Sequence, residues 1–93
     1  MVSSSDIYRA IRDRDPWLLT ALRAGETGAH RGVARLLTVT RLEVLKRDAD
    51  HLVDVVAACP ELHEGIRHAW TAQDPRFTAQ FLSTVGRRTP RAA

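Results

Sequence analysis

The sequence has one cysteine, few aromatic residues and almost no lysine. The single cysteine, Cys59, excludes an internal disulfide bond and agrees with a reducing compartment. Aromatic residues make up 5% of the chain, and Lys46 is the only lysine, so arginine supplies the rest of the basic charge. A bias toward arginine can reflect a GC-rich genome, as in many bacteria. The net charge of +3 therefore does not by itself indicate an anionic partner.

Long apolar runs are also missing. No run approaches the roughly 20 residues that a membrane-spanning helix needs, and the first residues lack the charged and apolar regions of a secretory signal. We therefore expect a cytoplasmic protein that does not associate with membranes. Gly25, Gly28 and Gly32 follow no strand pattern, which excludes the phosphate-binding glycine loops of dinucleotide-binding and P-loop proteins.

What the sequence does contain is helix punctuation at short intervals. Asp15-Pro16 and Asp74-Pro75 each place a capping carboxylate before a proline, which is tolerated at the first helical position. No segment shows the alternation of a strand. With 93 residues, 44% of them hydrophobic, the chain has the size of one domain. The sequence predicts an all-α fold, a compact bundle of about six short helices, with one domain over residues 1–86 and a flexible basic tail over 87–93.

The clearest element is a long central helix over residues 41–58. Thr40 and Glu43 have the spacing of a capping box, and Pro60 ends the helix near Cys59. Between these signals, apolar residues recur at spacings of three and four, which is typical of one buried helix face. They are Leu42, Leu45, Ala49, Leu52, Val53 and Val56.

Charge changes sign midway along this predicted helix. Up to Arg47, nine basic residues accompany five acidic ones, whereas from Asp48 to Gly86 six acidic residues accompany two basic ones. Complementary surfaces of this kind can orient protein partners. In size, helix number and charge layout the chain resembles death-fold adaptors. We therefore expect a non-enzymatic protein-interaction or self-assembly module whose partner is another protein or a second copy. The candidate protein-binding residues are Arg9, Arg12, Arg14, Asp50, Asp54, Glu61 and Glu64.

A second interpretation is DNA binding through residues 32–47. This segment resembles the helix-turn-helix of bacterial regulators. The residues at the usual packing positions of that motif are Val33, Ala34, Leu37, Val39 and Val44. The resemblance implies that Arg41, Lys46 and Arg47 contact phosphates or base edges. Against it, the buried stripe runs on past Arg47, a position that the motif buries, and acidic residues from Asp48 onward would repel DNA.

Two weaker patterns concern metal binding and catalysis. His63 and His68 flank a Glu-containing segment like that of zinc proteases, but five residues apart they diverge by about 140° around a helix. The pairs Cys59 with His63 and Glu64 with His68 supply only two ligands each. Cys59 beside His63 could serve as a nucleophile, but no orienting third group accompanies them. We therefore predict no metal, no cofactor and no catalytic residue.

Overall fold

The computed structural model describes residues 4–88, and within them every regular element is a helix, with no strand. The α-helices, in chain order, are α1 (Ser4–Arg12), α2 (Pro16–Arg23), α3 (Thr27–Val39), α4 (Leu42–Leu45), α5 (Ala49–Ala57), α6 (His63–Thr71) and α7 (Pro75–Arg88). Two single-turn 3-10 segments, η1 (Lys46–Asp48) and η2 (Pro60–Leu62), precede α5 and α6. The expected all-α bundle of short helices is confirmed.

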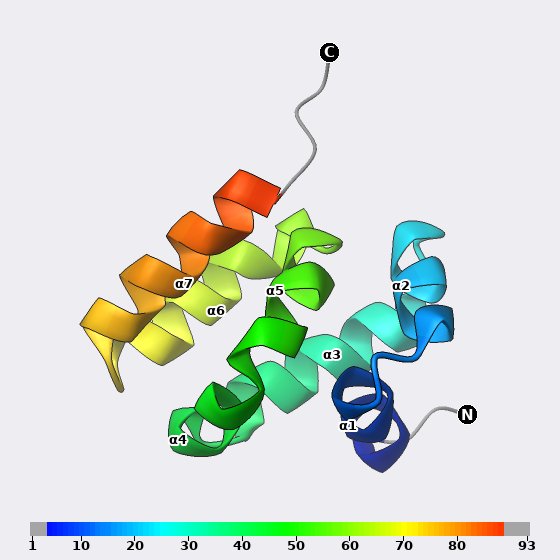
Figure 1. The fold of residues 1–93 in the computed structure, drawn as a ribbon, viewed down its shortest axis with the longest axis horizontal. Helices are drawn as coiled ribbons and strands as arrows, with labels where there is room; N and C mark the ends of the chain where they lie inside the picture. The colour runs from blue at the N-terminus through cyan, green and yellow to red at the C-terminus, as the bar shows by residue number, and fades with distance from the viewer. Residues whose placement is uncertain (1–3, 89–93) are drawn as a thin grey trace.

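The helices form two groups on either side of α5. In Figure 1, α6 and α7 lie alongside each other on one side, while α1, α2 and α3 pack together on the other. Helix α5 contacts α7 on one flank and α1 and α2 on the other. The molecule measures 35 × 33 × 20 Å, and since a helix with its side chains is about 10 Å across, the shortest dimension corresponds to two helix layers.

Two helix ends use the same hydrogen-bonded turn. After α1, the Asp15 amide donates to Ala10 O at 2.8 Å and the Arg14 amide to Ile11 O at 3.2 Å. This is a Schellman turn, whose penultimate residue takes a left-handed conformation. Gly25 does so after α2 with φ 77°, but after α1 the position holds Arg14 with φ 53°. The first helix therefore ends where the sequence predicts, before Asp15, although without the usual glycine.

The Asp-Pro signals mark helix starts as predicted. Asp15 is the N-cap of α2, and its carboxylate accepts from the Trp17 amide at 3.5 Å. The Asp74 carboxylate accepts from the Phe77 amide at 3.0 Å at the start of α7. Helix α7 continues through Gly86 to Arg88. The first two residues of the predicted tail are thus helical, and residues 89–93 lie outside the described part of the chain.

The predicted central helix is helical but not continuous. The 3-10 segment η1 separates α4 from α5, and Asp48 leaves the α region with φ −114° and ψ 25°. Two residues of η1 contact other parts of the molecule: Lys46 pairs with Asp74, and Asp48 accepts a hydrogen bond from Tyr8. The buried stripe itself is confirmed, since all of its members except the half-buried Ala49 are buried.

The capping box expected at Thr40 does not form. Thr40 is the C-cap of α3, Arg41 is the N-cap of α4, and neither Arg41 nor any other side chain of that turn caps the helix start. Instead the Leu42 amide donates to the Gln73 side-chain oxygen at 3.0 Å. Gln73, which follows α6, thus bonds a free amide at the helix start that we expected Thr40 to cap.

Three buried or half-buried histidines face the ends of other helices. Imidazole nitrogens of His30, His51 and His63 lie 2.9 to 3.1 Å from carbonyl oxygens near the C-termini of α2, α1 and α5. Since a carbonyl oxygen only accepts, each of these nitrogens carries hydrogen. The histidines therefore add a second hydrogen bond to carbonyls that already accept one from the backbone amide three residues further on.

No helix within residues 4–88 has both the length and the apolar character that crossing a membrane requires.

Candidate functional site: a basic hollow between α1 and α3

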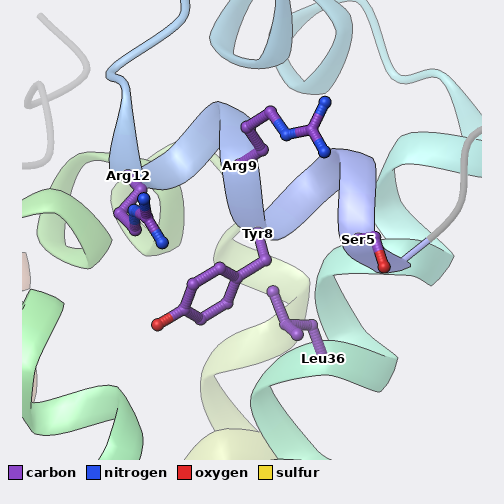
Figure 2. Close-up of a pocket in the computed structure, with 5 residues that line it drawn as sticks. All are labelled: Ser5, Tyr8, Arg9, Arg12 and Leu36. Carbon is purple, nitrogen blue, oxygen red and sulfur yellow. The ribbon is translucent and has the colours of Figure 1, made fainter.

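A solvent-open hollow of about 470 Å³ lies where α1 crosses α3. Its lining consists of Ser5, Tyr8, Arg9, Arg12 and Leu36. Figure 2 shows the Tyr8 ring beside Leu36, with Arg9 and Arg12 rising from successive turns of α1. The hollow thus combines an aromatic ring and an aliphatic side chain with two guanidinium groups. We call it the basic hollow.

The helical period places these side chains together. Ser5, Tyr8, Arg9 and Arg12 follow one another at spacings that keep them on one face of α1. The opposite face of α1, with Ile7, Ala10 and Ile11, is buried in the core. One residue on α3 lets the two helices approach closely: a Cβ at Gly32 would lie 2.0 Å from Ile7 Cδ1. Glycine at this position therefore leaves room for the Ile7 side chain between α1 and α3.

Tyr8 is fixed in the basic hollow by a contact across 40 residues of sequence. Its hydroxyl donates to Asp48 Oδ2 at 2.9 Å. This hydrogen bond, followed by burial and the charge of Asp48, raises the pKa of Tyr8, while the positive charges of Arg12 and Arg47 act in the opposite direction. The ring is therefore held as a neutral phenol, and Arg47 adds a third positive charge near the basic hollow.

The structure separates the predicted protein-binding residues by sign. The basic ones, Arg9, Arg12 and Arg14, are exposed, and within residues 4–88 they form no ion pair. Arg9 and Arg12 share the basic hollow, whereas Arg14 lies in the turn after α1 and lines a smaller hollow with Asp54.

Most of the predicted acidic residues already have partners within the molecule. Asp54 pairs with Arg88 at 3.2 Å, Glu64 with Arg67 at 2.7 Å, and Glu61 contacts His30. Asp50 is exposed and, in the part of the chain that the structure describes, forms no ion pair. The acidic candidates therefore do not gather into one free surface comparable with the basic hollow.

The residues predicted to contact DNA also differ among themselves. Lys46 binds Asp74 at 2.5 Å and lies 5.2 Å from the centre of the Phe77 ring, so its charge is engaged inside the molecule. Arg41 and Arg47 are exposed. The expected second helix of the motif is the single turn α4, and Val39, expected to pack within the motif, is 75% exposed. In this segment α4 is followed directly by the 3-10 segment η1.

The thiol considered as a nucleophile lies in the core. Cys59 is fully buried, and this burial, together with the charge of Glu61, raises the pKa of its thiol to about 12. His63 Nε2 lies 2.9 Å from Val56 O, so the imidazole hydrogen is directed at a backbone carbonyl. Because the thiolate is the reactive form, this arrangement does not activate Cys59 for nucleophilic attack. His30, Cys59 and Glu61 are the group of described residues whose atoms lie close enough to hold a metal ion.

Sequence reasoning identified part of the basic hollow and missed the rest. Arg9 and Arg12 were chosen for their charge alone. Tyr8 and Leu36 were not among the candidates, yet both line the hollow. The spacing of Ser5, Tyr8, Arg9 and Arg12 contained a signal, because residues three and four apart share a helix face. Nothing in the sequence indicated that Leu36 or Asp48 would lie beside that face.

Comparisons with protein-family models, curated proteins and solved structures found no match for this chain.

Proposed function

We propose that this chain is a protein-interaction module whose basic hollow binds an acidic segment of another protein. The observation that carries the proposal is that Arg9 and Arg12, which form no ion pair within residues 4–88, line one hollow together with the half-buried Tyr8. Surface arginines without a partner are costly to bury, but a carboxylate-bearing ligand can satisfy them with charge-assisted hydrogen bonds.

The composition of the basic hollow suits a short peptide with mixed character. Arginine and tyrosine are enriched at protein interfaces because they combine a large apolar contact area with directed polar groups. The Tyr8 ring and Leu36 supply an apolar floor, and the two guanidinium groups supply charge and direction. An acidic segment that also carries apolar side chains matches both parts.

A different protein is a better partner than a second copy of this chain. Head-to-tail association of copies needs a free acidic surface to meet the basic hollow. Asp54, Glu61 and Glu64 already have intramolecular partners, so their contribution to such a surface is reduced. The asymmetry between free basic and engaged acidic candidates therefore favours a heterologous acidic partner.

The test measures binding of two fluorescent peptides by anisotropy. One contains clustered Asp and Glu residues with Leu and Phe; the other has the same sequence with every acid replaced by its amide. We expect the acidic peptide to bind, the amide peptide to bind at least about tenfold more weakly, and affinity to fall as salt rises. Double reversal of charge with Arg9→Glu and Arg12→Glu should reduce acidic-peptide binding to the level of the amide peptide.

A matched control separates the basic hollow from overall charge. Arg23→Glu and Arg76→Glu make the same change in net charge at exposed helical arginines outside the basic hollow. Equal losses from both double variants, or no acidic-peptide binding to the native chain, would contradict the proposal. Salt-sensitive binding to duplex DNA that depends on Arg41 and Arg47, without peptide binding, would support the DNA interpretation instead.

A further inference from the structure

Three potential metal ligands meet beside the start of η2, two of them close in sequence and the third from α3. His30 belongs to α3, Cys59 is the last residue before η2, and Glu61 lies within η2. One ligand atom of each, an imidazole nitrogen, the thiol sulfur and a carboxylate oxygen, lies within 4.8 Å of the other two. We propose that His30, Cys59 and Glu61 form a binding site for a zinc ion.

The orientation of His30 is that of a metal-binding histidine. Its Nε2 lies 2.9 Å from Leu22 O and donates its hydrogen to this carbonyl, while Nδ1 faces the Glu61 carboxylate. Metal-binding histidines almost always donate their second nitrogen to a carbonyl or carboxylate in this way, because the bond fixes the ring and its tautomer. In the neutral ring, the lone pair of Nδ1 is then directed at a carboxylate oxygen. Two such acceptors repel each other unless a cation lies between them.

The combination of ligands favours zinc over other common divalent ions. Imidazole and thiolate are preferred zinc ligands, whereas calcium and magnesium take oxygen ligands almost exclusively. The Cys59 sulfur is buried, but the adjacent Glu61 side chain is 57% exposed. An ion can therefore reach the sulfur from solvent past this carboxylate. On binding, the thiol proton leaves to solvent and the sulfur forms the bond to zinc. Three protein ligands leave one tetrahedral position for water.

A zinc ion here would join the two halves of the sequence. The site connects α3, and through Leu22 O the end of α2, to the turn that leads from α5 into α6. It lies on α3 six residues before Leu36, about 9 Å along the helix axis from the basic hollow. The zinc ligands and the residues that line the basic hollow are different. It would stabilise the folded chain by the usual linkage between ligand binding and folding.

Without zinc, the same arrangement would be an ion pair between a protonated His30 and Glu61 beside a buried thiol. In the ion pair a proton lies between His30 and Glu61 and the Cys59 sulfur binds no metal. A spectroscopic signal from a metal-bound sulfur therefore distinguishes the zinc site from the ion pair. Cobalt(II) replaces zinc in such sites and gives a near-ultraviolet charge-transfer band only when a thiolate is bound. Its visible bands are intense only in tetrahedral geometry.

The experiment titrates the full chain with cobalt(II) under reducing conditions and then adds zinc. We expect the sulfur-to-cobalt band to saturate at one equivalent and to disappear when zinc displaces cobalt. Cys59→Ala should abolish the band, and Glu61→Gln should weaken cobalt binding by about tenfold or more. Zinc should raise the melting temperature of the native chain but not that of Cys59→Ala.

Two control variants retain the proposed ligands. His63→Gln alters another imidazole that faces a backbone carbonyl, and Glu64→Gln alters another exposed carboxylate nearby; both should bind cobalt like the native chain. If Cys59→Ala fails to fold, the exposed Glu61→Gln variant still tests the site. Absence of the band in the native chain, or equal binding by Glu61→Gln and Glu64→Gln, would overturn the proposal.

Discussion

The two halves of this molecule differ in whether their charged side chains form ion pairs. Around α1 and α3, Arg9 and Arg12 are exposed residues that line a solvent-open hollow, and they form no ion pair within residues 4–88. Around α5, α6 and α7, charged side chains pair with one another, as Lys46 does with Asp74 and Arg88 with Asp54. Most of the acidic candidates in the second half thus have intramolecular partners, whereas the first half presents charge that a partner could use.

Packing differs between the halves as well. The contact of α1 with α3 is built from aliphatic and small side chains, and Gly32 permits the close approach. The α6 and α7 side contains an aromatic cluster, in which the Trp70 ring centre lies 5.0 Å from that of Phe81 and 6.1 Å from that of Phe77. We infer that the aromatic half anchors the fold and that the close-packed half positions the basic hollow.

The largest expected effect is the loss of Trp70. Its side chain is fully buried, and its indole nitrogen donates to Leu37 O at 2.8 Å. Trp70→Ala leaves a cavity and an unpaired carbonyl, so we expect the free energy of unfolding to fall by about 3–5 kcal/mol in urea denaturation. Trp17, which is 39% exposed on α2, is the matched control, and Trp17→Ala should cost less than about 1 kcal/mol. Similar losses from the two variants would remove the distinction between the halves.

A smaller effect is expected at the contact of α1 with α3. Gly32→Ala places a methyl group against the fully buried Ile7, and such overpacking costs about 1–3 kcal/mol. It should also weaken peptide binding, because the walls of the basic hollow move apart. Gly28→Ala, on the same helix with nothing within 4 Å of the new methyl, should leave stability unchanged or raise it by up to about 1 kcal/mol. Thermal denaturation and peptide anisotropy measure both effects, and equal results for the two variants would contradict the close approach.

The smallest effect concerns the pH dependence of the paired half. The hydrogen bond from Lys46, and then that from the Phe77 amide, lower the pKa of Asp74 below its ordinary value. A carboxyl whose folded pKa is below its unfolded pKa stabilises the fold above the unfolded value, near pH 4, and loses this contribution as pH falls through the folded value. We therefore expect the native chain to lose stability in acid more steeply than Asp74→Asn, which keeps a capping side chain but cannot ionise.

A second variant tests the cause of that dependence. Lys46→Met removes the partner of Asp74 and leaves the cap in place, so the acid-dependent loss of stability should shrink but not vanish. Urea denaturation from about pH 7 to about pH 3 measures it. If both variants lose stability in acid as steeply as the native chain, other carboxyl groups cause the loss of stability at low pH.

Helix starts and buried faces could be predicted from the sequence because their causes are local. Asp15 and Asp74 cap the helices that follow them, and the stripe from Leu42 to Val56 is buried as its spacing predicts. The errors occur where a tertiary contact replaces a local signal. Gln73 instead of Thr40 serves the start of α4, and a 3-10 turn interrupts the central helix where Lys46 and Asp48 contact other helices.

The candidate site was predictable only as a set of charges. Arg9 and Arg12 could be chosen from the sequence by their charge. The same criterion also selected acidic residues that are paired in the folded chain, such as Asp54. Neither the partners of Asp54 and Glu61 nor the hydrogen-bond acceptor of Tyr8 is close in sequence. Whether a charged side chain is free depends on what folding brings beside it, and composition does not contain that information.

By itself the sequence determined an all-α domain, most of its helix starts and the stripe that α4 and α5 bury, since each follows from spacing and capping within a few residues. Only the tertiary structure decided which charges stay free, where Leu36 meets the arginines of α1, and that His30 reaches Cys59 and Glu61. The physical reason is the sequence separation over which each interaction acts. Capping and amphipathic patterns act between neighbouring residues, whereas hollows and ligand clusters form where packed helices bring distant residues together.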